Sequence, residues 1–195
     1  MTFFAALVVV YVVFKIKKTL KQIKSLRLGR DGERIVGEYL DALREDGHRV
    51  FHDLLGDNFN LDHVIVSTKG IFVVETKTYS KPVKGDDKIQ YDGEKITIAG
   101  RKPTIEPIVE VTSASKWLKN ILKESTGKDY SIKPVVVFPG WFIETKDDGW
   151  KSPVWVMNPK ALQSFINNEK DKISRDDMML ATFHLSRYIR SKAAK

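Results

Sequence analysis

At 195 residues, with 42% hydrophobic and 30% charged residues, the chain has the size and composition of one globular domain with a short extra segment. The absence of cysteine excludes a disulfide framework and a thiolate metal site. The four histidines are scattered without the spacing of a zinc site, so we expect them to be surface or packed residues.

The positive charge is concentrated near the N-terminus. Seven basic residues precede the first acidic residue, Asp31, and account for seven of the eight excess charges, which leaves about one for the rest of the chain. These residues are Lys15, Lys17, Lys18, Lys21, Lys24, Arg27 and Arg30. A nearly neutral body lacks the broad basic surface of a stable DNA-binding module, but it does not exclude a nuclease with a local groove.

An uncharged run of residues, 1–14, precedes these basic residues. As a helix it would span about 21 Å, against a hydrocarbon core of about 30 Å, and Ile16 with snorkelling lysines would add about one turn. Basic flanks stay on the cytoplasmic side. We therefore expect a membrane-anchor helix over residues 1–18, a basic juxtamembrane linker over 19–30 and a cytoplasmic body. The alternative is a buried or partner-binding helix.

The body, residues 31–195, opens with a predicted helix over 31–46, which Gly47 ends. Its two candidate acidic residues lie on different faces. Glu33 falls on the same face as the apolar residues that follow it by one and two turns, whereas Glu38 falls on the polar face. Glu33 is therefore the better candidate for a site residue. Alternatively, it is an acid that the positive end of the helix stabilises.

A predicted strand over 48–54 leads to the most informative stretch, residues 61–77. Two β-branched runs flank Ser67-Thr68-Lys69-Gly70, which predicts a hairpin with Gly70 at the positive-φ position of a type I turn plus bulge. Asp62 and Glu75 lie about equally far from the middle of this turn. The two carboxylates should therefore lie side by side on neighbouring strands.

Side chains alternate between the faces of a strand, so Glu75 and Lys77 share one face. The carboxylates of Asp62 and Glu75 and the ammonium group of Lys77 therefore converge on one patch. Carboxylate oxygens suit a hard cation such as Mg²⁺ or Mn²⁺, which takes one or two carboxylates and keeps several waters. A lysine beside the metal would orient or deprotonate one of those waters. The alternative is a cross-strand salt bridge on a solvated face.

The rest of the chain alternates strands and helices. Strands are predicted over 88–90 and 95–98, joined by a turn at Asp92-Gly93, and over 135–138 and 154–157. Helices are predicted after Pro107, after the capping residue Asn158 and after Ser174. There is no glycine-rich phosphate loop, which excludes nucleotide hydrolysis by a P-loop mechanism.

Asp62 followed at a distance by Glu75-Thr76-Lys77 resembles the PD-(D/E)XK nuclease signature, and the wider context resembles the nuclease-related domain, NERD. Residues 29–36 (GRDGERIV) are similar to the family's GxxGExxV opening, 61–66 (LDHVIV) to its IDHVVV strand and 70–77 (GIFVVETK) to its GIFVIETK strand. Residues 106–110 (EPIVE) stand where the family has NPxxQ, and 134–140 (PVVVFPG) match another of its strands.

The sequence departs from the family pattern at four positions: Asn60, Thr78, Glu106 and Glu110. The last of these adds an acid near the site, as an additional ligand or as an obstacle to substrate. The resemblance implies a restriction-endonuclease-like α/β fold, a mixed sheet flanked by helices.

It also implies an Mg²⁺- or Mn²⁺-dependent nuclease that cleaves DNA or RNA. In that enzyme Asp62 and Glu75 hold the metal, Lys77 positions the attacking water and Glu33 supports a water or a second metal. Tyr91, about where the family often has tryptophan, would stack on a base, although a packed hairpin residue is the commoner role. The competing interpretation is a membrane-tethered binding or scaffold protein that has lost the chemistry.

Overall fold

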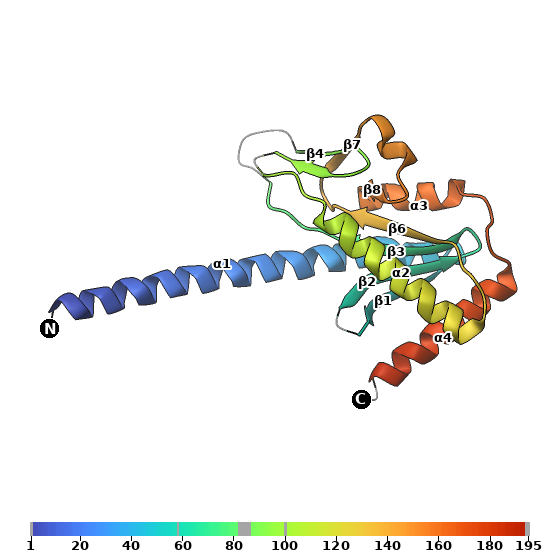
Figure 1. Cartoon of the computed structure of the whole chain (residues 1–195), viewed down its shortest axis with the longest axis horizontal. Helices are drawn as coiled ribbons and strands as arrows, with labels where there is room; N and C mark the ends of the chain where they lie inside the picture. The colour runs from blue at the N-terminus through green and yellow to red at the C-terminus, as the bar shows by residue number, and fades with distance from the viewer. Residues whose placement is uncertain (1, 58, 82–86, 100, 194–195) are drawn as a thin grey trace.

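A computed structural model of the chain describes residues 2–57, 59–81, 87–99 and 101–193. Its centre is a five-stranded mixed sheet with the order β1-β2-β3-β6-β8 (Figure 1). Strands β1 to β3 run antiparallel, and β6 and β8 run parallel to β3. The strands are β1 (Arg49–Leu55), β2 (Asn60–Ser67), β3 (Gly70–Thr76), β6 (Ile132–Val137) and β8 (Trp155–Met157). The predicted mixed α/β fold is confirmed.

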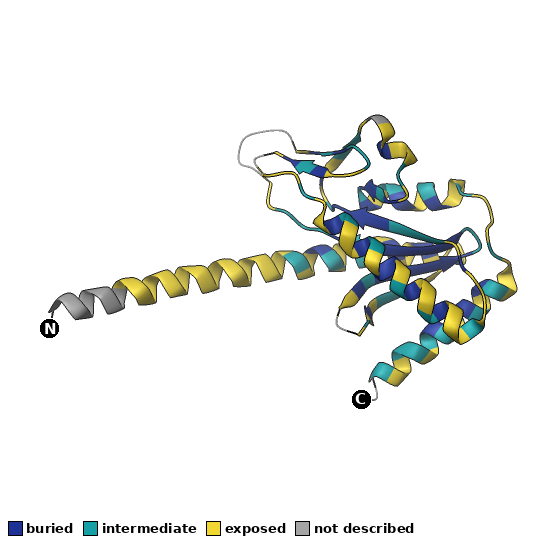
Figure 2. Ribbon diagram, in the orientation of Figure 1, coloured by how far each residue is buried: buried dark blue, intermediate teal, exposed yellow. Residues whose placement is uncertain are grey.

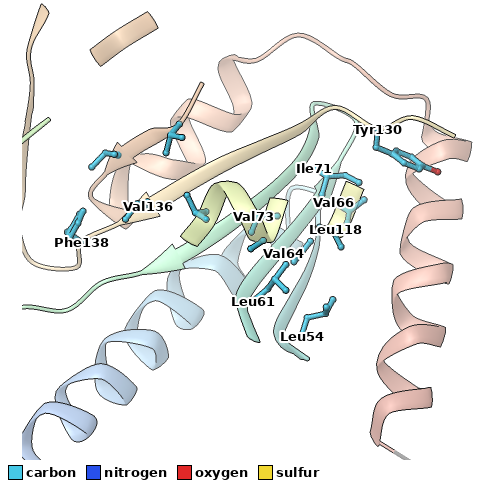
Figure 3. Packing of buried hydrophobic residues seen from close by; sticks show 14 of the residues in the cluster. Leu54, Leu61, Val64, Val66, Ile71, Val73, Leu118, Tyr130, Val136 and Phe138 are labelled. Carbon is cyan, nitrogen blue, oxygen red and sulfur yellow. The ribbon is translucent and has the colours of Figure 1, made fainter. Parts of the chain in front are cut away.

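Helices cover both faces of this sheet. Helices α2 (Glu106–Thr126) and α4 (Arg175–Ala193) pack on one face, and the C-terminal part of α1 (Thr2–Asp41) and α3 (Pro159–Asn168) lie on the other side. A short 3-10 helix, η1 (Ala42–Arg44), follows α1. Each face has its own hydrophobic cluster, and the central strands between them are the most buried part of the chain (Figure 2). Figure 3 shows residues of the cluster under α2 and α4.

Strand β3 shows how the sequence builds both clusters. Ile71 and Val73 enter the cluster under α2, whereas Phe72 and Val74 enter the cluster under α1 and α3. All four are at most 1% exposed, as expected of a strand that helices cover on both faces. The alternation places Glu75 on the α2 side, one position beyond the last buried aliphatic residue.

The β2–β3 turn is tighter than predicted. Ser67 pairs with Gly70, so the loop contains two residues and lacks the expected bulge. Gly70 has the predicted positive φ, +126°, and a Cβ there would lie 3.1 Å from the carbonyl oxygen of Ser131. This loop fixes the register, with His63 opposite Val74, and thereby places Asp62 beside Glu75.

The second hairpin belongs to a separate small sheet with the order β5-β4-β7. Strands β4 (Lys88–Tyr91) and β5 (Ile96–Ile98) are antiparallel, as predicted, and Gly93 adopts φ +101° in their turn. Strand β7 (Phe142–Thr145), which runs parallel to β4, was not predicted. A 3-10 helix, η2 (Asp147–Lys151), leads from β7 toward β8.

The N-terminal region differs from the prediction. The expected anchor, linker and first helix of the body form one continuous helix of 40 residues, α1, which extends away from the body (Figure 1). Its described residues 10–30 are almost all exposed (Figure 2). Within the described chain, no helix combines the length and the apolar character needed to cross a membrane. The spanning anchor over 1–18 is therefore not supported: lysines at 15, 17 and 18 interrupt the apolar run too early. Met1 lies outside the described residues.

Candidate metal-dependent active site

The predicted carboxylates meet where the C-terminal end of β3 lies beside the start of β2. Asp62 lies one position beyond the last β2–β3 pair, His63 with Val74. The backbone N–H of Thr76 donates a hydrogen bond to Asp62 Oδ2 (2.8 Å), which turns the carboxylate toward the end of β3. The hairpin alone therefore brings the carboxylate of Asp62 next to that of Glu75.

Helix α2 contributes a third carboxylate. Glu110 lies one turn into this helix, and its Oε2 is 2.6 Å from Lys77 Nζ. The same ammonium group is 2.9 Å from Glu75 Oε1. Lys77 thus bridges the strand carboxylate and the helix carboxylate, and its side chain is 24% exposed. Glu110, which departs from the family pattern, takes the role of an ion-pair partner of Lys77.

The surroundings of the two strand carboxylates, Asp62 and Glu75, destabilise their charged forms. Burial, together with the neighbouring charges of Glu75 and Glu33, raises the pKa of Asp62 to about 7, against an ordinary 3.8, although the Thr76 N–H opposes the shift. Burial also raises the pKa of Glu75, partly offset by Lys77. The carboxylate pair therefore lacks one compensating positive charge.

Lys77 keeps its proton. Burial by itself would lower the pKa of the ammonium group, but hydrogen bonds and charge attraction from Glu110 and Glu75 outweigh it, and the pKa lies well above its ordinary value. A lysine in this state can donate hydrogen bonds and stabilise negative charge. Both roles predicted for Lys77, orienting a water or deprotonating it, stay predictions, and the raised pKa favours the orienting one.

Helix α1 brings Glu33 to the same place. Glu33 is half-buried and raises the pKa values of Asp62 and Glu75 through its charge, whereas Glu38 is exposed, as the predicted faces required. Gly32 makes this approach possible. A Cβ at that position would lie 1.9 Å from Cγ2 of Thr78, just beyond β3, so only glycine lets the helix pass this closely.

A family model described as the nuclease-related domain matches residues 28–139, which include all five of these charged residues and more than half of the chain. The chain belongs to the nuclease-related domain family. It is 29% identical over 87 residues to an uncharacterized protein of Bacillus anthracis. That match covers 42% of this chain, and the chain spans 41% of the length of that relative.

Among solved structures, this nuclease-related domain matches SfsA of Pyrococcus furiosus, whose structure is in complex with Ca²⁺. The sequences are 18% identical, and the match covers 66% of this chain and 54% of that chain with a TM-score of 0.32. A likeness of this size carries no argument about activity.

Tyr91 does not have the role predicted for it in this nuclease-related domain. It is 1% exposed in the hydrophobic cluster, and its hydroxyl group lies 2.6 Å from Ser152 Oγ and donates to the carbonyl oxygen of Gly93 (3.1 Å). A base cannot stack on a ring that is covered on both faces. The prediction that Tyr91 binds substrate is therefore wrong, and the packed hairpin residue is the role it takes.

Two residues near the carboxylates were not anticipated. Tyr79 lies two positions beyond Lys77, and its ring stacks on Phe138 with centroids 5.9 Å apart. The exposed guanidinium group of Arg101 lies over the ring of Tyr79, 4.7 Å from its centroid. Tyr79 could have been found from the sequence, because residues two positions apart in an extended segment, such as Lys77 and Tyr79, point to the same side. Arg101 had none, because the fold joins it to Tyr79 from a separate segment.

The donor set fits a divalent cation of the Mg²⁺ or Mn²⁺ type. Among the described residues, no group of three or more acidic or histidine side chains is arranged as a ready-made metal cluster. A pair of carboxylates meets the protein's share of an Mg²⁺ site, since this ion keeps several of its waters. The half-buried pair Asp62 and Glu75 could hold such an ion, whose positive charge would offset the repulsion between the two carboxylates.

Proposed function

We propose that the body is a metal-dependent nuclease that hydrolyses phosphodiester bonds of nucleic acid. The observation that carries this proposal is the pair of half-buried carboxylates, Asp62 and Glu75, with raised pKa values beside the ammonium group of Lys77, which is 2.9 Å from Glu75 Oε1. Perturbed acids grouped with a cation are typical of sites that perform chemistry, while a purely structural ion pair lowers the pKa of its acid. Membership of the family supports the same conclusion.

In this proposal Asp62 and Glu75 would hold Mg²⁺ or Mn²⁺. When bound, the ion supplies a Lewis acid and a water of lowered pKa. Glu33, which approaches both carboxylates from α1, would orient a water on the helix side. Each of these side chains stands on a regular strand or helix, which holds the group more accurately than a loop would.

Lys77 would act on the substrate. Hydrolysis transfers the hydroxyl group of water to phosphorus, breaks one P–O bond and delivers a proton to the leaving oxygen. The protonated ammonium group would bind the phosphate oxygens and stabilise the charge that develops on them. Its ion pair with Glu110 (2.6 Å) competes with this role, because the substrate must attract the ammonium group away from a carboxylate.

The test is cleavage of plasmid, single-stranded DNA and RNA by the full chain with Mg²⁺ or Mn²⁺. Cleavage that Asp62→Asn and Glu75→Gln both abolish, and that Glu38→Gln leaves intact, supports the assignment. Calorimetry should show metal binding that the first two variants lose. Metal binding equal to that of the parent in both variants would refute the site.

The second candidate is a nuclease-like binding protein without activity. The specific observation in its favour is that Lys77 is engaged by two carboxylates, one of them the unusual Glu110. In that case the parent binds nucleic acid without cleaving it, with any metal. Glu110→Gln decides whether the ion pair is the cause, because it restores the neutral residue typical of the family at that position.

For localisation we propose attachment along a membrane surface. The exposed apolar residues of the described part of α1 alternate with Lys15, Lys17, Lys18, Lys21 and Lys24, a composition suited to an anionic leaflet on the cytoplasmic side. The full chain should sediment with anionic vesicles but not with neutral ones, and high salt should release it. Equal binding to both vesicles would refute this proposal.

A further inference from the structure

A second feature of the described part of the molecule lies away from the carboxylates, between the two sheets. It is a groove of about 980 Å³ bordered by β7 at the edge of the small sheet, β8 at the edge of the large sheet, η2 and α3. Among the described strands, none pairs with either edge strand on this side. The site proposed for catalysis uses none of these elements.

Aromatic side chains dominate this groove, and two of them are open to solvent. Trp150 on η2 is 65% exposed and Phe142 on β7 is 62% exposed. Trp150 lies nearly parallel to Phe165 of α3, at 19° with ring centroids 6.5 Å apart, and Trp155 of β8 meets Phe165 edge-on. What sets these rings apart from other exposed residues of the chain is that they lie together over one groove, and a contiguous apolar patch of this kind is typical of a binding surface.

The groove continues toward the carboxylates. A second hollow, of about 320 Å³, is bordered by Thr78 and Tyr79, which directly follow Lys77. Gly140, Asn158 and Lys160 border both hollows. The two hollows therefore adjoin, and the second reaches the two residues that directly follow Lys77.

The charges beside the groove are suited to a polyanion. Lys160 lines it, and Lys133 Nζ lies 5.1 Å from the ring centroid of Trp155. Glu169 also lines the groove, but its Oε2 is 2.5 Å from Lys172 Nζ, so this carboxylate is neutralised. Aromatic faces flanked by lysines are the combination that single strands require: stacking for the bases and cations for the phosphates.

We infer that the groove between β7 and β8 binds unpaired nucleobases of a single-stranded segment, with Trp150 and Phe142 as the stacking faces. The substrate class is then a strand with an unpaired region near the cleaved bond, since paired bases cannot offer their faces to the protein. This inference rests on the proposed nuclease function for its meaning, and its binding measurement is independent of cleavage.

The test is binding of fluorescently labelled dT and rU oligomers to the full chain, with EDTA present so that no cleavage occurs. Trp150→Ala and Phe142→Ala should each weaken binding roughly 5- to 100-fold, the usual loss for one stacked base. Phe183→Ala is the matched control, because Phe183 is a 56% exposed aromatic residue on α4, outside the groove. An oligomer with abasic positions should bind as weakly to the parent as the normal oligomer binds to the variants.

Three results with oligomers would overturn the inference: parent-like binding by both groove variants, equal binding of the abasic oligomer, or a duplex that binds as well as the single strand. A fourth is that the protein binds an extended peptide at the edges of β7 and β8 and binds none of the oligomers. Groove-dependent binding without any cleavage supports the inference while refuting the nuclease. If Trp150→Ala and Phe142→Ala change neither cleavage nor oligomer binding, the nuclease proposal is supported and the groove inference is refuted.

Discussion

The replacement Asp62→Asn is expected to stabilise the metal-free protein at neutral and alkaline pH. The pKa of Asp62 is about 7 in the folded chain, against an ordinary 3.8. At about 1.4 kcal/mol per pKa unit, carrying the charge in the folded state costs at most about 4 kcal/mol, and less where solvent reaches the group. Asparagine carries no charge and keeps an oxygen that accepts the N–H of Thr76.

The sign of the pH dependence follows from the raised pKa. Below about pH 4 the carboxyl group is neutral in both the folded and the unfolded chain, so parent and variant should be equally stable in this respect. As the pH rises from about 4 to about 7, the unfolded chain loses its proton first, and the parent loses stability that the variant keeps. Above about pH 7 the difference should level off, at roughly 2 to 4 kcal/mol.

The assay is urea unfolding of both proteins at several pH values between 4 and 8.5, in EDTA. Mg²⁺ or Mn²⁺ should then stabilise the parent at pH 8 and have little effect on the variant. Glu38→Gln is the control, since it removes an exposed acid of the same helix that carries Glu33. A stability difference that is absent at pH 8, or that does not change between pH 4 and pH 8, would show that Asp62 carries no electrostatic strain.

Three other variants test separate parts of the structure. Glu110→Gln should raise the initial cleavage rate roughly 2- to 5-fold, because it removes one of the charges that compete for Lys77; a slower enzyme would mean that Glu110 is required. Glu33→Gln should weaken metal binding about 10-fold in calorimetry while Glu38→Gln has no effect, and the reverse order would contradict the placement of α1. Leu118→Ala, in the fully buried face of α2, should cost about 2 to 5 kcal/mol in urea unfolding, and a change below about 1 kcal/mol would contradict its packing.

The carboxylate pair could be predicted from the sequence because its geometry is local. A two-residue turn at Thr68-Lys69 determines the register of everything on β2 and β3, and so places Asp62 beside Glu75. The face of Glu33 followed in the same way from helical periodicity. Such positions depend on the turn and helix preferences of a few neighbouring residues, which can be judged from the sequence.

What could not be predicted depends on distant contacts. Strand β7 pairs with β4 across about fifty residues of sequence. Its sequence, FIET, is too short to show the alternation of apolar and polar residues that predicts a strand. That pairing buries Tyr91 and leaves Phe142 exposed. Of the two aromatic residues, the exposed one is therefore not the one that the sequence suggested. The continuity of α1 was missed because the basic residues 19–30 were assigned to a linker, whereas they are helical and lead directly to Gly32, which lies close to Thr78.

Because α1 is unbroken, a rotation of this helix about its axis would change the position of Glu33 at the candidate site. Glu33 stands on the same 40-residue helix that carries the exposed apolar and basic residues, and the first described one of these, Val10, lies about 35 Å away at 1.5 Å per residue. A helix of this kind is stiff in twist, so a rotation imposed at its free end is passed along the axis. Turning it by one residue, about 100°, would swing Glu33 off the carboxylates and drive Gly32 out of its contact with Thr78. A contact that rotates the N-terminal end of α1 would therefore also move Glu33 relative to Asp62 and Glu75.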